Sequence, residues 1–259
     1  MVEPFLSQGN FEGALNVVKN LFEQRHFKFR TMHLEAAFLH HMLAIIHRRA
    51  GNATLSLQHA NQALSVSRTI SYEDDEFTVK CLNDVGLAHL QGNEFTDALN
   101  AFNEALRIMT EIDPKSPSIA SILGNIGSAH EKSGNLAAAR EPYERSYFQL
   151  MSTLGPDHPS TADAQTNLGL YQLYSGVSGN GLSHLENSSA FWGASNESSL
   201  SAAKSNFNLA LSLYKSGNIP ASLEAGKKSR WQLIKSLTEA HEDTAKAAAL
   251  LNRIRTEKV

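Results

Sequence analysis

The sequence has little cysteine, no long apolar run and almost no excess of charge. Its single cysteine, Cys81, excludes an internal disulfide and a cysteine zinc site, and it fits a reducing compartment. No apolar run approaches the ~18 residues of a membrane span. The first residues lack a basic region followed by an apolar stretch, so we expect no signal peptide. These absences predict a cytoplasmic protein without a membrane span.

The motifs of catalysis and of cofactor binding are also missing. The serines are dispersed and none lies in a GxSxG context, no phosphate loop is present, and the glycine-rich stretch 176–181 follows no strand. Asp157 and His158 form a pair, but a triad would need a nucleophile beside the histidine. His47, His89 and His130 share one repeated position, where we expect packing between helices and no metal. We therefore expect no enzyme, no cofactor and no metal site.

A regular repeat runs through the chain. Glycines recur in steps of 41 or 42 residues, and all but one are followed by asparagine; they are Gly9, Gly51, Gly92, Gly134, Gly176 and Gly217. Three further columns keep nearly the same step and hold small residues, with Leu21 as the exception. They are Ala14, Ser56, Ala98, Ala139, Gly181, Ser222; Ala44, Gly86, Gly127, Gly169, Ala210; and Leu21, Ala63, Ala105, Ser146, Ser188, Ser229.

The columns indicate pairs of packed helices. Each Gly-Asn lies between two amphipathic runs, and glycine permits the positive φ with which many helices end. In the run 95–106 apolar residues follow the i, i+3, i+4, i+7 spacing of a helix. Small residues at fixed points let helix backbones approach closely. Each unit is thus a helix–turn–helix that must stack on its neighbours to bury its apolar face.

The stretch NIGSAHEKSGNLAAAREPYERSY (125–147) resembles the tetratricopeptide repeat. That family's common unit has 34 residues, so the step here is longer by about two helical turns. The connector LGPDHPSTA (154–162) resembles the long-repeat class found in kinesin light chains and in clustered-mitochondria-type proteins. The resemblance implies an all-α fold, a right-handed α-α superhelix built as a tetratricopeptide-repeat solenoid.

The columns divide the chain into one array. We expect a partial repeat with only its second helix in residues 1–30, and a C-terminal capping helix in 239–259. The full repeats between them are expected at 31–72, 73–114, 115–156, 157–197 and 198–238. The cut first unit also suggests that the sequence belongs to a longer protein.

Asp157 and His158 lie in a connector that recurs. IDPKSPSIA (112–120) and LTEAHEDTA (237–245) align with LGPDHPSTA, so that Pro114 pairs with Pro156 and His241 with His158. Prolines end one helix and suit the first turn of the next. We expect Thr161 or Ser160 to cap the new helix.

The resemblance also implies that the first helix of each pair lines a concave face on which an extended peptide lies. The small residue of the second column faces the partner helix, which places four asparagines on the exposed face: Asn83, Asn125, Asn167 and Asn208. An asparagine amide offers a donor and an acceptor to a peptide backbone. Similar asparagines serve that role in the kinesin-light-chain-like class, so we expect it here.

The same face carries cations and aromatic residues. The cations are Arg48, Arg49, Lys80, Lys132, Lys204 and Lys215, against three acids, Asp84, Glu131 and Asp163; the aromatic anchors are Tyr174, Phe207 and Tyr214. Leu90 and Thr166 fall on this face by the same spacing. The local charge of about +3 contrasts with the net charge of −3 of the chain, and the local field steers a partner. We therefore expect a preference for acidic peptides.

These observations favour a non-catalytic protein-protein interaction module, an adaptor or scaffold that binds a protein or peptide. Two alternatives stay open. One is an RNA-associated or organelle-distribution scaffold of the clustered-mitochondria type, although the charge balance does not favour nucleic acid. The other is a structural domain whose face is covered by other domains of a longer chain.

Overall fold

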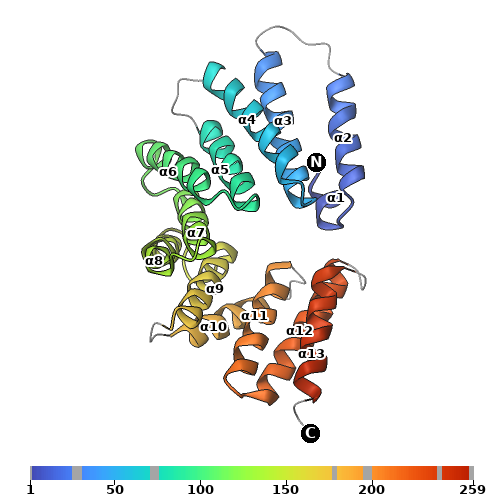
Figure 1. Cartoon of the computed structure of the whole chain (residues 1–259), viewed down its shortest axis with the longest axis vertical. Coiled ribbons are helices and arrows are strands. Elements are labelled where there is room, and N and C mark those ends of the chain that lie inside the picture. Colours follow the sequence, from blue (N-terminus) through green and yellow to red (C-terminus); the bar gives the residue numbers. More distant parts are fainter. Residues whose placement is uncertain are drawn as a thin grey trace. The chain divides into compact units, whose positions relative to one another are not determined.

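The computed structural model describes residues 2–24, 31–70, 76–176, 180–194, 200–237 and 241–256. These residues form thirteen helices and no strand (Figure 1). The helices are α1 (Glu3–Ser7), α2 (Phe11–Gln24), α3 (Thr31–Arg49), α4 (Ala53–Ile70), α5 (Glu76–Gln91), α6 (Phe95–Ile112), α7 (Pro117–Lys132), α8 (Leu136–Thr153), α9 (Pro159–Tyr174), α10 (Gly181–Ala194), α11 (Leu200–Lys215), α12 (Ile219–Ser236) and α13 (Glu242–Thr256). No helix in the described ranges has the length and apolar character needed to cross a membrane.

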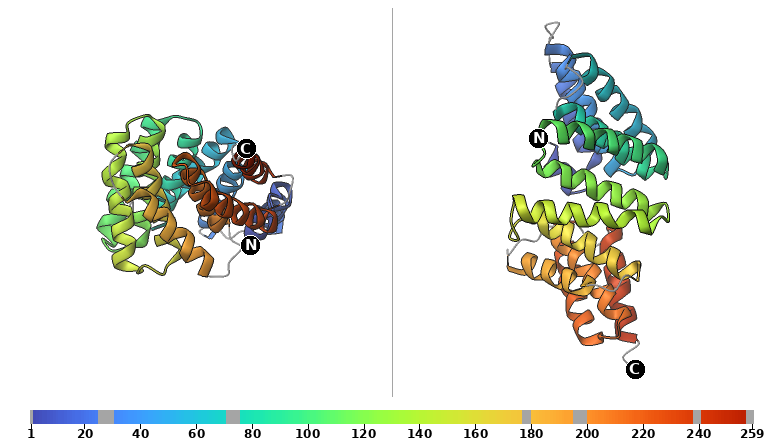
Figure 2. Two further views of the ribbon diagram at one scale, coloured as in Figure 1. Left: turned by 90° about the horizontal axis from the view of Figure 1, so that it is seen from below. Right: turned by 90° about the vertical axis from the view of Figure 1, so that its left-hand side faces the viewer.

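The chain divides into two compact units, and the boundary between them along the sequence falls within α8. Unit 1 comprises Met1–Ser146 and unit 2 comprises Tyr147–Val259. Within unit 1, α3 packs on α4 and α5 on α6; within unit 2, α9 packs on α10 and α11 on α12, and α13 follows (Figure 2). Each unit is therefore a row of helix pairs with its own packing.

The Gly-Asn turns show why that dipeptide recurs. Gly51 has a φ of 82° as the chain leaves α3, a conformation that glycine adopts at little steric cost. Asn52 then accepts a hydrogen bond from the backbone N–H of Leu55 at 3.1 Å and so caps the start of α4. The turn between α5 and α6 differs, because there Asn93 itself has the positive φ, 61°. At the α3–α4 turn, glycine thus ends one helix and asparagine begins the next.

The small columns lie where helices touch. A Cβ atom on Gly127 would lie 2.7 Å from Cδ1 of Tyr143, so α7 and α8 approach closely only because this position lacks a side chain. The third column joins helices by hydrogen bonds: Ser146 donates to the carbonyl of Ala120 at 2.7 Å in unit 1, and Ser229 donates to that of Ala203 at 2.9 Å in unit 2. The column residues therefore join helices in two ways: their small size permits close approach, and serine hydroxyls donate hydrogen bonds to the neighbouring helix.

Each unit buries its own apolar core. In unit 1 the core includes Phe102 and Ile108 of α6 and Leu82 of α5. In unit 2 it includes Leu185, Leu209 and Ile254. Cys81 is buried in the core of unit 1.

The N-terminal part of the chain contains one helix that the repeat pattern did not predict. The short helix α1 precedes α2 and was not predicted, because five residues are too few to show helical periodicity. The predicted repeat boundaries at 114/115 and 156/157 fall between helices. Those at 30/31, 72/73, 197/198 and 238/239 touch residues outside the described ranges. The assignment of the whole chain to one array stays a prediction.

Candidate functional site

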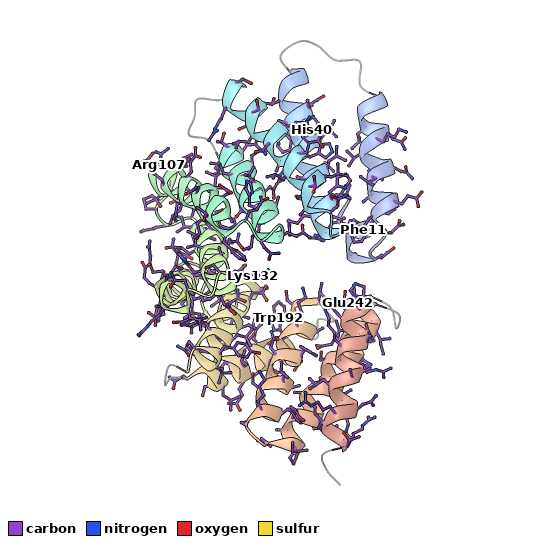
Figure 3. All side chains as sticks on the ribbon, in the orientation of Figure 1. Phe11, His40, Arg107, Lys132, Trp192 and Glu242 are labelled. Carbon is purple, nitrogen blue, oxygen red and sulfur yellow. The ribbon has the colours of Figure 1, made fainter. Side chains whose placement is uncertain are left out.

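None of the thirteen predicted face residues is buried. Unit 1 carries Arg48, Arg49, Lys80, Asn83, Asn125 and Lys132; unit 2 carries Asn167, Tyr174, Lys204, Phe207, Asn208, Tyr214 and Lys215. All of them are exposed or half-buried on the first helices of the pairs, α3, α5, α7, α9 and α11. Lys132, for example, stands at the end of α7 (Figure 3).

In unit 1 two of the predicted asparagines contact each other. The Nδ2 of Asn125 donates to the Oδ1 of Asn83 at 2.8 Å, which links α7 to α5. The other half of each amide has no hydrogen-bond partner within the described part of the chain. Whichever way the two amides are turned, this pair keeps a donor and an acceptor for a bound molecule.

A pocket of about 190 Å³ opens between α5 and α7, and we call it the α5–α7 pocket. Lys80, Asn83 and Asp84 of α5 line it together with Ser118 and Ser121 of α7. Val79, Met109 and Ile122, all part of the core, also line it, and His41 and Glu76 complete the lining. Two predicted site residues, Lys80 and Asn83, thus border one cavity.

A second pocket, of about 170 Å³, opens between α11 and α13 in unit 2, and we call it the α11–α13 pocket. Its lining joins three predicted site residues to four that were not predicted: Lys204, Phe207 and Asn208, with Ala203, Leu233, Asp243 and Lys246. Ala203, Leu233 and Ala247 form a small apolar cluster against which Phe207 packs. The walls of this pocket are therefore largely apolar.

The two pockets occupy the same position of the repeat. Lys80 and Lys204 each stand six residues before the small residue of the second column. Met109 and Leu233 each stand four residues after the third column. The connector alignment pairs Ser118 with Asp243 and Ser121 with Lys246. Unit 1 and unit 2 therefore build one pocket each from the same set of columns.

The neighbouring position in each unit is closed by large side chains. Between α3 and α5, the rings of Phe38 and Phe77 lie 4.4 Å apart. Between α9 and α11, the repeat position that holds Met109 and Leu233 elsewhere, four residues after the third column, holds Trp192. Trp192 is 3% exposed and packs against Ala162 and Ala202 (Figure 3). Within each unit, one position is thus filled by the chain's own aromatic side chains and another is open.

Several predicted cations are already engaged. Arg49 pairs with Glu3 at 2.9 Å. Lys215 lies 4.6 Å from the centre of the Tyr174 ring, and the Tyr214 hydroxyl accepts a hydrogen bond from Arg253 at 2.9 Å. Tyr174 and Tyr214 are therefore linked to neighbouring cations on the face of unit 2.

Arg48 lies beside the polar surface of α5 in unit 1. Its carbonyl accepts a hydrogen bond from Nε2 of Gln91 at 3.0 Å. Burial lowers the pKa of the Arg48 guanidinium, while the charge of Asp84 opposes this shift. The Nε of Arg48 and the Oε1 of Gln91 are buried atoms without a hydrogen-bond partner within the described ranges. Such atoms are uncommon, and a bound molecule is one way to satisfy them.

Three residues expected on the exposed face turn inward. Asp84 is 5% exposed because His41 of α3 holds its Oδ2 at 2.5 Å, while the adjacent His40 contacts His59 of α4. Leu90 belongs to the core of unit 1. Thr166 is buried because its hydroxyl bonds the carbonyl of Ala162 and the hydroxyl of Ser188. The spacing rule therefore placed these three residues wrongly.

The connector histidine has a structural role. The Nδ1 of His158 accepts the backbone N–H of Ser160 at 3.1 Å, so His158 caps α9 and Pro159 occupies its first turn. The expected cap at Ser160 or Thr161 is wrong, and Thr161 instead donates to the carbonyl of Gly155 at 2.8 Å. His241 accepts the N–H of Asp243 in the same way at 3.2 Å. The column shared by His158 and His241 is a capping position.

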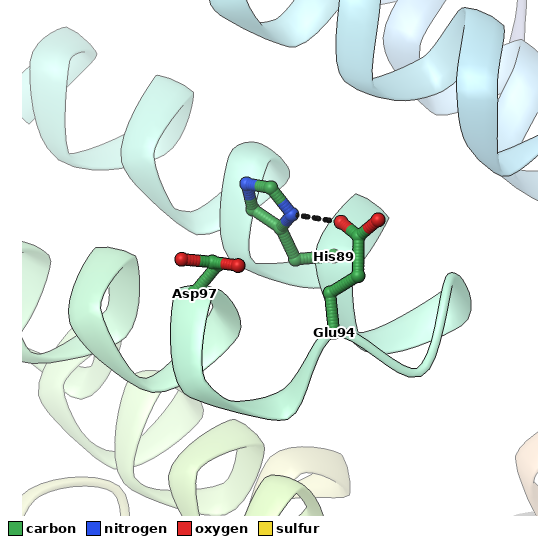
Figure 4. Close-up of side chains that lie close together, drawn as sticks. All are labelled: His89, Glu94 and Asp97. Carbon is green, nitrogen blue, oxygen red and sulfur yellow. Dashed lines mark hydrogen bonds and ion pairs between the residues drawn. The ribbon is translucent and has the colours of Figure 1, made fainter.

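One cluster has the composition of a metal site. His89, Glu94 and Asp97 bring one nitrogen and two carboxylate oxygens within 4.8 Å of one another (Figure 4). Both acids belong to the start of α6, where carboxylates interact favourably with the helix dipole, and His89 lies in the last turn of α5. His89 already contacts Glu94 at 2.5 Å. Helix ends and this contact account for the three side chains without an ion.

The comparisons with known proteins agree with this geometry. A family model for the tetratricopeptide repeat matches residues 34–111, 83–150 and 118–176. The chain belongs to this family. No curated protein matches it. Among solved structures, the kinesin light chain TPR-like repeats of Podosopora anserina are 17% identical, with a TM-score of 0.60, over 77% of this chain and 97% of that one.

Two further solved structures share the fold. A Rap protein complexed with competence and sporulation factor is 14% identical, with a TM-score of 0.68, over 99% of this chain and 73% of that one. Aspartyl phosphate phosphatase F from Bacillus subtilis is 14% identical, with a TM-score of 0.67, over 99% of this chain and 68% of that one. At these identities the likeness shows the fold alone. The predicted all-α fold built from tetratricopeptide repeats is confirmed.

Proposed function

We propose that this chain is a non-catalytic interaction module whose first helices bind an extended peptide of a partner protein. The observation that carries the proposal is the repeated pocket. Both units place a pocket between successive first helices, from the same columns, and line it with residues of the predicted peptide-binding face. Pockets that repeat along a row of helices suit an extended peptide, because its side chains also recur at regular intervals and can enter successive pockets.

The polar groups around the pockets support the same role. In unit 1 the Asn83–Asn125 pair keeps a donor and an acceptor free for a peptide backbone. In unit 2, Asn167 of α9 is exposed and Asn208 of α11 is half-buried, and each stands two residues before the small residue of the second column. A relative of this fold is complexed with competence and sporulation factor. A preference for acidic peptides rests on Lys80, Lys132 and Lys204, and a cytoplasmic location is part of the proposal.

A peptide library tests this function. The whole chain is panned against displayed random 12-residue peptides, and the selected peptides are measured by calorimetry. We expect Asn83→Ala with Asn125→Ala, and Asn167→Ala with Asn208→Ala, each to weaken binding by about tenfold, since each lost hydrogen bond contributes about 0.5–1.5 kcal/mol. Asn103→Ala, exposed on the second helix α6, is the matched control. A library without binders, or binders indifferent to both double variants with unchanged circular dichroism, would refute the proposal.

A further inference from the structure

We infer that the α11–α13 pocket binds one apolar side chain of the partner, a phenyl or branched aliphatic group. This inference rests on the proposed function and specifies what the unit 2 face selects. Its basis is the lining of the pocket, its volume and the way in which the chain fills the neighbouring position.

The lining of the α11–α13 pocket is suited to an apolar group. Ala203 and Leu233 are buried at 0% and 2% exposure, and Phe207 forms a half-buried wall. At the rim, Lys246 already pairs with Glu242 at 2.7 Å and lies 3.8 Å from Asp243. A charged side chain would lose its water against Ala203, Leu233 and Phe207, with Lys204 as the one lining cation that has no ion pair in the described ranges, whereas an apolar side chain loses nothing by leaving water.

The volume limits the group to one side chain. A cavity of about 150 Å³ lined by Leu, Ile and Phe holds one benzene molecule. The α11–α13 pocket has about 170 Å³, enough for a phenyl or isobutyl group. The pocket therefore selects by size as well as by polarity.

The chain itself shows which chemistry this position takes. Between α9 and α11 the equivalent place is occupied by Trp192, packed against Ala162, Ala202 and Phe191. In the row of unit 2, an aromatic ring thus fills one position from inside. At the next position Leu233 replaces the tryptophan and leaves a space with the same kind of walls. An apolar side chain of the partner fills the space that a tryptophan would occupy and that Leu233 leaves open.

The pocket of unit 1 differs in its lining. The carboxylates of Glu76 and Asp84, the imidazole of His41 and the hydroxyls of Ser118 and Ser121 border it. Polar groups of this density favour a hydrogen-bonding side chain. The apolar preference therefore belongs to unit 2.

The test uses small probes on the whole chain. N-acetyl-phenylalaninamide and N-acetyl-leucinamide are titrated into methyl-labelled protein and followed by NMR. We expect saturable shifts at the methyl groups of Ala203, Leu233 and Ala247, with affinities at least about tenfold above those of N-acetyl-alaninamide and N-acetyl-lysinamide, because a full side chain is buried.

A substitution taken from the chain's own pattern closes the pocket. Leu233→Trp places at this position the residue found at 192, and we expect it to abolish the shifts at Ala203 and Ala247. Met109→Trp makes the same change in the α5–α7 pocket and is the matched control, which leaves the unit 2 shifts in place. If Leu233→Trp fails to fold, Phe207→Ala removes one half-buried wall and is expected to weaken the two apolar probes by about tenfold. Equal binding of all four probes, or probe shifts that survive both unit 2 variants, overturns the inference.

The selected peptides separate this inference from the proposed function. Binders whose affinity for the chain falls with Leu233→Trp, and which carry Phe, Leu, Ile or Met at one fixed position, support both. Binders that respond to the asparagine variants but keep their affinity with Leu233→Trp leave the function standing and overturn the apolar anchor.

Discussion

The α5–α7 pocket of unit 1 is bordered by the carboxylates of Glu76 and Asp84, whereas the α11–α13 pocket of unit 2 is lined by the buried Ala203 and Leu233, with Lys204, Asp243 and Lys246 as its charged residues. Both pockets are built from the same columns of the repeat, so they share one helix framework. The side chains that line the two pockets differ in polarity. The columns that hold small residues fix how closely helices approach. The residues between them are free to differ, and they decide whether a position is filled, polar or apolar. A repeat can thus keep its architecture while each unit acquires its own selectivity.

Removing the Trp192 side chain should open the filled position between α9 and α11 in unit 2. Trp192 is almost fully buried, and its Nε1 has no hydrogen-bond partner in the described ranges, so its contribution is packing. We expect Trp192→Ala to lower the free energy of unfolding by about 3–5 kcal/mol. Urea denaturation measures this loss, and indole added to the variant should restore part of it by filling the new cavity.

Trp231 provides the matched control, because it is 54% exposed on α12 and Trp231→Ala removes a side chain of the same kind. We expect that variant to change stability by less than about 1 kcal/mol. Equal losses for the two tryptophans would show that the α9–α11 position is not filled as described.

A second prediction compares the column glycines of the two units. A Cβ at Gly127 in unit 1 would lie 2.7 Å from Tyr143, and one at Gly169 in unit 2 would lie 2.8 Å from the carbonyl oxygen of Gly181. We expect Gly127→Ala and Gly169→Ala each to cost about 1–3 kcal/mol by overpacking. Thermal unfolding of the two variants measures whether both units depend on the same close approach.

Glycines outside the column serve as controls. At Gly124, on the same helix as Gly127, the nearest atom to an added Cβ is Ser146 Oγ at 3.6 Å, and at Gly193 nothing lies within 4 Å. Alanine is favoured over glycine in a helix by about 0.5–1 kcal/mol, so Gly124→Ala should be neutral or stabilising. A similar cost at Gly124 and Gly127 would refute the role assigned to the column.

The sequence could predict the helices, the turns and the close contacts, because these repeat with the period of the chain. It placed Lys80, Asn83, Lys204, Phe207 and Asn208 on the first helices, where the structure has them beside pockets. It did not predict the pockets, because their other walls come from a second helix and from the start of the following first helix. The offset of four residues from the third column, shared by Met109, Trp192 and Leu233, was the available signal.

The periodicity of the sequence could not predict the burial of Asp84, for a related reason. A helix position is exposed or covered according to its neighbours, and His41 reaches Asp84 from α3, 43 positions earlier in the chain. The repeat describes what the units share, so a contact made by one pair of side chains in one unit leaves no trace in the columns.

The smallest expected difference between the units is their response to acid. In unit 1 burial, and then the charge of His59, lower the pKa values of His40 and His47; in unit 2 burial lowers that of His184. Unfolding returns each group to about 6.5. Below that pH the unfolded chain binds more protons, so stability falls as the pH drops from about 6.5 toward the folded pKa values.

Unit 1 should therefore lose more stability than unit 2 between pH 7 and pH 5.5, because it holds two such histidines and a third imidazole beside them. Both tryptophans lie in unit 2, so their fluorescence in urea follows that unit, and hydrogen exchange at α3 and α4 follows unit 1. His59→Gln removes the neighbouring charge and should reduce the slope of stability against pH in unit 1 alone. Equal slopes for the two units in the unmodified chain, or a slope that His59→Gln leaves unchanged, would contradict this account of the histidine cluster.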